Sequence, residues 1–413
     1  MKNVFLIGNG FDLHHMLPTK YYDFMCIVEY LSNNTLLFPI NIGDVFSKCT
    51  ENKNIINCYN AHKEVFDSIE VESDKIIEIS NLIQDNIWFE YFSKTLNRDL
   101  RWIDFEKEIF TVINTLDEII ALDEETVYLP QHESLPPFIL SNFRFFIDAY
   151  DNVGLYSGDS LDIKDQYLIE YPYNSGIYVA DKKKIFEELY NKLLDFSKAL
   201  NLYFACFIEN AFDLLQKDNY MNKNRIDLIN IADIAVSFNY TSTLEKLYFN
   251  KKAFHIHGTI KEQKMVLGVN PDKTDDIGTN DTSLIKFKKY YQREVYGTDI
   301  EYINWYRETI GTKTEYRVIA IGHSLDETDK DIISDMFLNA KEIYITYYDN
   351  VCKDSYIANI VKMFGKSGFD KFRRDQHMQF IPLCDVDSLK EKIKPEEILW
   401  DYINYGKEKI EII

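Results

Sequence analysis

The pattern of apolar positions toward the two ends of the chain predicts short, buried β-strands. The runs KNVFLI and RVIAI are almost continuously apolar instead of alternating with polar residues. Such runs are typical of parallel strands that are covered on both faces. Bounded by turn residues, they lie at Lys2–Ile7, Ile234–Phe238, Ala253–Ile256, Met265–Val269, Arg317–Ile321, Glu342–Tyr347 and Met378–Ile381.

Between about Tyr21 and Gln216 the apolar positions recur every three or four residues, as in KKIFEELYNKLLDFSKALNLYFACFIENAFDLL, which predicts helices. Residues 154–176 are rich in Gly, Ser, Asp and Tyr and predict an irregular loop or small hairpin. From about Ile231 strand and helix patterns alternate, as in a doubly wound sheet. We therefore expect an α/β fold with a parallel sheet flanked by helices. Residues 1–20 and 231–413 form its body, and 21–230 form a mainly helical insertion.

Composition narrows the classes of function. Lys and Arg number 46 and Asp and Glu 67, so the net charge is −21 over 413 residues, which argues against a nucleic acid partner. The six cysteines are scattered without a CxxC pair, which favours a reducing compartment over a disulfide framework or a zinc ribbon. The first apolar run is too short for a signal peptide, and we see no run long enough to span a membrane. These features predict a cytoplasmic protein.

The first strand runs directly into Gly8-Asn9-Gly10-Phe11-Asp12. Glycines at this position allow the backbone to approach a phosphate closely, and amides of the following helix can hold the anion. A tight turn without a ligand explains the same glycines equally well. If the turn binds a diphosphate, replacing Gly10 with Val should weaken nucleotide binding and leave the fold largely intact.

Polar residues follow the next two strands. Asn239 comes after the strand in SFNYTSTLE, where it suits either a ribose hydroxyl or an attacking water, or else closes a turn. Ser242 and Glu245 have the spacing of a helix capping box. In FHIHG, His255 and His257 lie on one face of an extended segment, where they fit core residues, a metal pair or a general base. The metal pair ranks lowest because no third ligand has suitable spacing.

A later strand ends in IGHSLDETDKD. Ser324 and Glu327 again have capping-box spacing, which leaves Gly322 and His323 to line the crevice at the strand end.

Acidic residues in two segments are interpreted as solvated. Asp326, Asp329 and Asp331 suit the first turn of a helix, although they also suggest a divalent metal. In WIDFEKEI, Asp104 and Glu106 lie on a predicted helix with an aromatic packing face.

Taken in order, the motifs IGNGFDLHHMLPTKYYDF, WIDFE, SFNYTSTLE, HIHG, LGVN and GHSLDETD resemble the AbiH family of bacterial abortive-infection phage-resistance proteins. The opening motif is specific, and the later ones are persuasive as an ordered set. The resemblance implies a role in phage defence.

The motifs also resemble, more distantly, the Rossmann-like fold of sirtuin-type NAD-binding proteins. This similarity implies that Asn239 orients the reacting ribose and that His257 is the base. The chain departs from the sirtuin pattern at Met16, Thr241 and His323, where sirtuins usually have Gly, Asp and Thr. Without CxxC pairs the zinc module of sirtuin deacetylases is absent from the sequence. The residues expected at the nucleotide are Gly8, Asn9, Gly10, Phe11, Asp12, His15, Pro18, Thr19, Gly322, His323 and Ser324.

Three functions follow from these motifs. The first is an NAD glycohydrolase, in which Asn239 anchors a ribose hydroxyl or water and His257 accepts a proton; nicotinamide leaves neutral, so no strong acid is needed. The second is a module that senses NAD or a related nucleotide and signals to a partner protein, favoured by the departures at Thr241 and His323. The third and weakest is a metal-dependent nuclease using Asp12, Asp326 and Asp329. We expect NAD as substrate or ligand and no metal. A phage-derived trigger and a homo-oligomer both remain open.

Overall fold

The computed structural model describes residues 1–34, 38–98, 103–120, 126–128, 147–148, 160–170, 178–248, 253–269 and 282–393. Within this part of the chain, six parallel strands form the main sheet in the order β11-β10-β9-β1-β7-β8. The α/β prediction is confirmed, and most predicted strands lie within a residue or two of their expected positions. The strands are β1 (Lys2–Ile7), β7 (Ile234–Ser237), β8 (Ala253–His255), β9 (Tyr316–Ile321), β10 (Glu342–Tyr347) and β11 (Gln379–Pro382).

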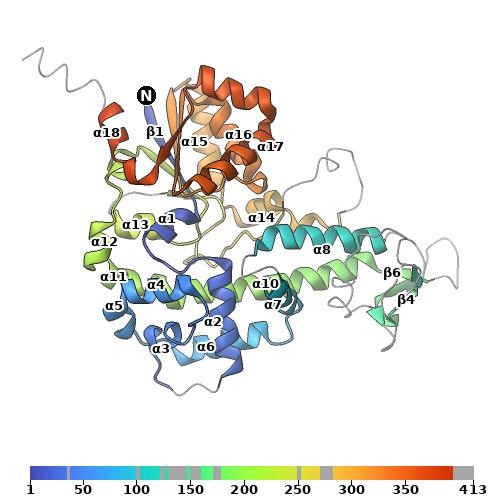
Figure 1. Cartoon of the computed structure of the whole chain (residues 1–413). Coiled ribbons are helices and arrows are strands. Elements are labelled where there is room, and N and C mark those ends of the chain that lie inside the picture. The colour runs from blue at the N-terminus through green and yellow to red at the C-terminus, as the bar shows by residue number, and fades with distance from the viewer. Residues whose placement is uncertain are drawn as a thin grey trace, which may run out of the picture.

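The central strand β1 is buried on both faces, which explains its continuous apolar run. Side chains alternate along a strand, so Val4 and Leu6 point to one face and Phe5 and Ile7 to the other. The first pair belongs to a core cluster that includes α15 (Ile300–Gly311), α16 (Lys330–Asn339) and α17 (Asn350–Asp375). The second pair belongs to a larger cluster that continues into the helical segment between β1 and β7. Figure 1 shows α15–α17 beside the sheet and most of the other helices gathered below it.

In the described residues between β1 and β7, helices predominate. The longest of these helices, α10, packs against α6 and α7, and its Phe196 and Tyr203 meet Phe24, Phe92 and Phe105 in an aromatic cluster. Burying many aromatic rings together holds these helices to one another. The helices are α2 (Tyr21–Asn33), α3 (Ile42–Phe46), α4 (Lys53–Ala61), α5 (Lys63–Asp67), α6 (Ser73–Ile83), α7 (Ile87–Arg98), α8 (Phe105–Ile120), α10 (Lys182–Phe207), α11 (Phe212–Leu215) and α12 (Asn219–Lys223).

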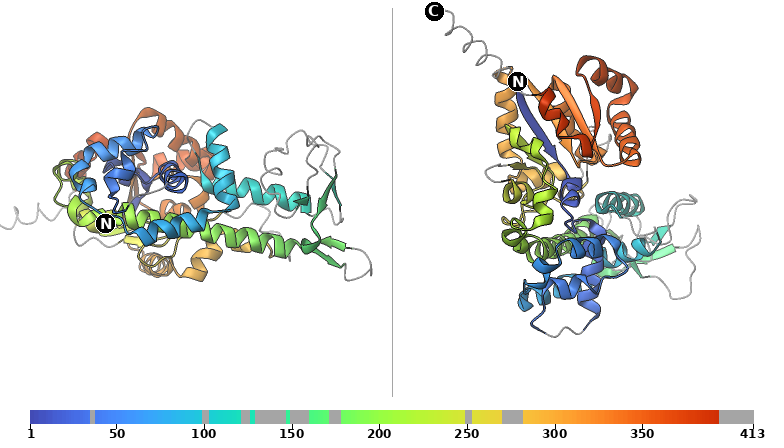
Figure 2. Two further views of the ribbon diagram at one scale, coloured as in Figure 1. Left: turned by 90° about the horizontal axis from the view of Figure 1, so that it is seen from below. Right: turned by 60° about the vertical axis from the view of Figure 1, so that its left-hand side comes forward.

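Short helices and small strands complete the described part of the chain. Both α8 and α10 extend away from the sheet toward small strands (Figures 1 and 2). The predicted loop at 154–176 contains β4 (Ser160–Ile163), a 3₁₀ turn (Asp165–Tyr167) and β5 (Leu168–Glu170), and its residues 154–159 and 171–176 lie outside the described residues. The remaining elements are α1 (Asn9–His14), β2 (Thr126–Tyr128), β3 (Ile147–Asp148), β4 (Ser160–Ile163), β5 (Leu168–Glu170), β6 (Tyr178–Ala180), α13 (Thr243–Leu247), α14 (Lys289–Tyr296) and α18 (Ser388–Lys392).

One predicted strand is wrong. Residues 265–269 are buried but do not join the sheet. Their backbone bonds to loops and side chains instead: Val266 N donates to His257 O at 2.9 Å, and Leu267 N donates to Gln292 Oε1 at 2.9 Å. The apolar run therefore predicted the burial of these residues correctly and their strand conformation incorrectly.

No helix in the described part of the chain is both long enough and apolar enough to cross a membrane. The six cysteines all lie in described residues and are free thiols. Burial raises the pKa of Cys49 to about 12, so this thiol stays protonated and is a poor nucleophile at neutral pH.

Candidate active site

The carboxyl ends of β1, β7, β8 and β9 meet at one edge of the sheet. Asn239, just after β7, donates from Nδ2 to Gly8 O, just after β1, at 3.1 Å. Gly8 also packs on His323, which follows β9: a Cβ on Gly8 would lie 2.5 Å from His323 Cα. The ring centroid of Phe238 lies 4.3 Å from that of His323 and 5.3 Å from that of His257. The structure thus places Asn239 against the turn after β1, and places His257 on the far side of Phe238 and His323 from that turn.

The glycines pack two turns against each other. Gly10 N donates to Gly322 O at 2.7 Å, and Phe11 N donates to Gly8 O at 2.9 Å. A Cβ on Gly10 would lie 2.7 Å from Gly322 Cα, and Gly322 itself has a φ of +67°. The expectation that Gly10→Val leaves the fold largely intact is therefore wrong, because the added side chain would push on backbone that has no room to move.

The segment after α1 folds back on the turn. Thr19 Oγ1 donates to Asn9 Oδ1 at 2.6 Å, and Tyr203 of α10 donates to Pro18 O at 2.6 Å. Met16 has a φ of 55°, a left-handed conformation that favours glycine. Asn9 is exposed, whereas Pro18 and Thr19 are buried.

His15 is held in the core. Its Nδ1 lies 2.8 Å from Phe11 O and its Nε2 lies 2.9 Å from the Tyr248 hydroxyl. A carbonyl only accepts, so Nδ1 carries the proton and Nε2 accepts from the hydroxyl. Burial lowers the pKa of His15 to about 3, so the ring is neutral. These contacts give His15 a structural role at the C-terminal end of α1.

Asp12 is a buried carboxylate beside Asn239. Its Oδ2 accepts from Thr241 Oγ1 at 2.6 Å, while its Oδ1 is enclosed without a hydrogen-bond partner. Burial raises its pKa to about 6, opposed by the bond from Thr241. The chain therefore has a buried carboxylate next to Thr241.

Asp329 is the centre of a buried polar cluster. Its Oδ1 lies 3.0 Å from His257 Nε2 and 2.8 Å from Lys289 Nζ, and its Oδ2 lies 3.6 Å from His323 Nε2. The same Lys289 Nζ lies 2.7 Å from Glu106 Oε2. We call Glu106, His257, Lys289, His323 and Asp329 the buried cluster; each is at most 8% exposed.

The charges in the buried cluster are set by these contacts. Burial lowers the pKa of His257, helped by the Lys289 cation and opposed by Asp329. Burial opposes ionisation of Asp329, but Lys289 and His257 outweigh it and hold the pKa of this carboxyl well below its usual range. Burial raises the pKa of Glu106 to about 7, since Lys289 compensates it only in part. His257 is therefore neutral and Asp329 ionised at neutral pH.

The other residues near the strand ends have separate partners. His255 lies 2.9 Å from both Asn239 O and Glu245 Oε1, and the Glu245 carboxylate outweighs burial to raise the pKa of His255. His255 and His257 thus face different carboxylates, which does not fit a metal pair. Ser324 is exposed, and its carbonyl accepts from Asn359 at 3.0 Å.

Several sequence interpretations are corrected here. Asp329 and Glu106 are buried and paired, not solvated, because Lys289 supplies the cation that a buried carboxylate needs. Neither capping box forms. Ser242 donates to Glu209 at 2.5 Å, and Asp326, not Ser324, caps the 3₁₀ turn Glu327–Asp329.

The three aspartates of the nuclease hypothesis have other partners in the structure. Asp12 contacts Thr241, Asp326 caps a turn, and Asp329 contacts Lys289. Among the described residues no group of three His, Cys, Asp or Glu side chains is arranged to hold a metal ion.

Lys289 is the site residue that sequence reasoning missed. It lies on α14 four residues before Arg293, which is also buried and contacts Asp331 and Asp299. In the sequence, two cations one helical turn apart indicate a solvated helix face. The segments that bury Lys289 and pair it with carboxylates lie far away in the sequence.

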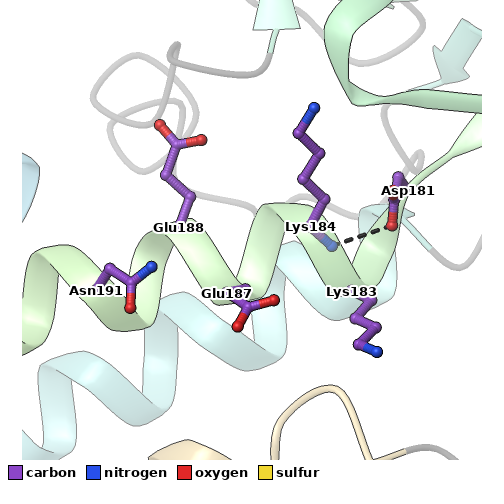
Figure 3. A pocket seen from close by; sticks show the side chains of 6 residues that line it. All are labelled: Asp181, Lys183, Lys184, Glu187, Glu188 and Asn191. Carbon is purple, nitrogen blue, oxygen red and sulfur yellow. Dashed lines mark hydrogen bonds between the residues drawn. The ribbon is translucent and has the colours of Figure 1, made fainter.

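A surface pocket lies elsewhere, at the outer end of α10. It is lined by one stretch of that helix and the residue before it (Figure 3). Its charged side chains pair with neighbours: Glu187 with Lys286 at 2.9 Å, and Glu188 with the Tyr167 hydroxyl at 2.7 Å. The pocket is thus separate from the strand ends. Its lining residues are Asp181, Lys183, Lys184, Glu187, Glu188 and Asn191.

Fold and site together define an α/β protein with one parallel sheet and a buried charged cluster at the carboxyl ends of its strands. The chain belongs to the bacteriophage abortive infection AbiH family, whose model matches residues 4–349. No curated protein and no solved structure matches it. The resemblance of the motifs to this family is confirmed, and membership supports a role in phage defence by abortive infection.

Proposed function

We propose that the protein is a phage-defence effector that binds NAD or a related nucleotide and hydrolyses the nicotinamide–ribose bond. The observation that carries the proposal is the bond from Asn239 to Gly8 O, with His257 following the next strand, at the carboxyl ends of the neighbouring parallel strands β1, β7 and β8. Ligands bind at this edge in open α/β sheets.

The strand order supports a Rossmann-like, nucleotide-binding sheet. Numbered along the chain, the six strands run 3-2-1-4-5-6, which is the order of dinucleotide-binding sheets. The order reverses between β1 and β9, the position where such sheets bind their ligand. Gly8 and Gly322 lie at that reversal.

The side chains at this edge suit hydrolysis. His257 is neutral, so it can accept a proton from water or a hydroxyl, and a positioned base is worth about 10² to 10⁴ in rate. Asn239 is fixed by its bond to Gly8 O and by the contact of His255 with its carbonyl. The enclosed carboxylate of Asp12 supplies negative charge nearby, which favours a site where positive charge develops on a ribose.

A sensing module is the second candidate, favoured by the state of the glycine turn. The amides of Gly10 and Phe11 both donate within the protein. They would leave phosphate binding to other groups, and the departures from the sirtuin pattern at Thr241 and His323 also favour binding without hydrolysis.

The test is nicotinamide release from NAD by the purified protein, with and without extract of phage-infected cells. Asn239→Ala and His257→Ala should each abolish release, and the double variant should cost much less than the sum because both act in one step. Asn191→Ala, on the exposed surface of α10, and His377→Asn, an exposed site with a φ of 47°, are matched controls.

Release by both variants at the wild-type rate would refute the catalytic assignment. Binding of NAD by calorimetry with no release under any condition would replace the enzyme by the sensor.

A further inference from the structure

We infer that Asp329 is a positioning residue for His257, and that Lys289, held by Glu106 of the helical segment, keeps Asp329 in the state that leaves His257 Nδ1 as the proton acceptor. This inference rests on the proposed function for its catalytic meaning. The geometry of the buried cluster carries it.

The tautomer of His257 follows from its contact with Asp329. An ionised carboxylate only accepts hydrogen bonds, so the ring nitrogen facing it, Nε2 at 3.0 Å, carries the proton. The lone pair then lies on Nδ1, the atom available to accept a proton from a substrate or water. Carboxylates fix histidine tautomers in the same way in metal sites and catalytic triads.

The orientation of Asp329 is fixed by its other donors. Lys289 Nζ shares its Oδ1 at 2.8 Å. His323 Nδ1 accepts from Leu325 N at 2.9 Å, so the proton of His323 lies on Nε2, which faces Asp329 Oδ2 at 3.6 Å. The two hydrogen bonds to Oδ1, together with the N–H of His323 that faces Oδ2 from beyond hydrogen-bond range at 3.6 Å, favour this orientation of the carboxylate.

Lys289 keeps the carboxyl of Asp329 ionised. It lies between Asp329 and Glu106, within 2.8 Å of both carboxylates. Without the cation, the burial of Asp329 would lose its largest compensation, and this carboxyl would take up a proton more readily. A protonated Asp329 would donate to His257 Nε2 and move the proton of His257 to Nδ1, which removes the accepting atom.

The cluster also joins two parts of the chain. Glu106 lies on α8 of the helical segment, Lys289 on α14, and Asp329 after β9. A displacement of α8 would therefore change the contacts of Lys289 and, through Asp329, those of His257.

The first experiment reads the tautomer of the full-length protein labelled with ring-¹⁵N histidine. His257→Gln assigns the signal by its loss. We expect wild type at pH 7.5 to show the proton on Nε2 and the lone pair on Nδ1. The reverse tautomer, or a doubly protonated ring, would overturn the inference. Since no NAD is present, this result is separate from a failure of the proposed function, which would appear as absent nicotinamide release.

The second experiment removes the buried pair with Glu106→Gln/Lys289→Met, which leaves the net charge unchanged. The charged and titratable groups around His257 are Asp329, Lys289 and Arg293, with Glu106 and His323 behind them. Loss of the Lys289 cation should raise the midpoint of the ¹⁵N titration of His257. The matched control Glu187→Gln/Lys286→Met makes the same change in a surface pair 2.9 Å apart and should leave the midpoint unchanged. Equal midpoints in wild type and the buried variant would refute the role of Lys289.

The third experiment applies if wild type releases nicotinamide. Asp329→Ala should lower kcat by about 10²- to 10⁴-fold with little change in KM, because Asp329 orients the base without touching the substrate. A variant that keeps the wild-type kcat and the Nε2-protonated tautomer would overturn the positioning role, and the ¹⁵N spectrum also shows whether the variant is folded.

Discussion

Replacing Asp12 with Asn should stabilise the protein at neutral pH and not at low pH. Asp12 is 1% exposed, and burial raises its pKa from 3.8 to about 6. A group with a raised pKa in the folded state stabilises folding below its unfolded pKa, and this stability is lost as the pH rises through the folded pKa. The shift of about two units corresponds to about 3 kcal/mol, since each unit is about 1.4 kcal/mol.

The structure limits how much of this energy Asn recovers. Its amide oxygen can accept from Thr241 as Asp12 Oδ2 does. Its amide nitrogen would then lie where Oδ1 has no partner, and an orphaned buried donor costs about 1–3 kcal/mol. The pH dependence is the firmer quantity, because that cost is the same at every pH.

The assay is urea unfolding of wild type and Asp12→Asn at pH 5 and pH 8. Between pH 4 and 6 the wild type should lose about 1.4 kcal/mol per pH unit relative to the variant, so the difference between the two proteins should change by about 1.4 kcal/mol from pH 5 to 8. Asp354→Asn, on the exposed surface of α17, is the control and should show no such change. A difference between wild type and Asp12→Asn that stays constant with pH would refute the reasoning.

Three further substitutions test the packing. Gly322→Ala should destabilise by at least about 1–2 kcal/mol, because its φ is +67° and the added Cβ would lie 2.2 Å from Phe11 N; thermal unfolding measures the loss. Tyr203→Phe should cost about 1–2 kcal/mol in urea unfolding by orphaning Pro18 O, and a neutral result would show that this bond contributes nothing. Trp88→Phe should cost about 2 kcal/mol, since the buried indole N–H donates to a carbonyl of α10 at 2.9 Å; an unchanged denaturation midpoint would contradict this.

The sheet could be predicted because its strands are buried on both faces. The run at β1 has no periodic polar position, and a run of that length bounded by glycine fits a parallel strand better than a helix. The run at 265–269 is also apolar and buried but is not a strand, since loops and Gln292 take its backbone bonds. The apolar composition of a run indicates that it is buried. Whether the run forms a strand depends on which other segments lie next to it and bond to its backbone.

The candidate site also contains residues that the sequence predicted and residues that it did not. Asn239 and His257 follow predicted strands, so the sheet alone brings them to one edge. Glu106 and Lys289 lie on helices, where a charged residue is normally solvated, and only the packing of α8 and α14 against the strand ends buries them. No local pattern marks such a pair, because each charge is compensated by a residue distant in sequence.

The opening GNGFD motif separates into residues that build the turn and residues that remain open to a ligand. Gly8, Gly10 and Phe11 are used within the fold: two of them give close backbone contact with the turn after β9, and the amides of Gly10 and Phe11 are bonded. Ser324, in contrast, is exposed on the turn after β9, whereas the exposed Asn9 is bonded through its side chain to Thr19. A nucleotide at this edge would therefore be held by side chains more than by the amides of the turn, which places substitution of Ser324 ahead of glycine substitutions for separating ligand binding from folding.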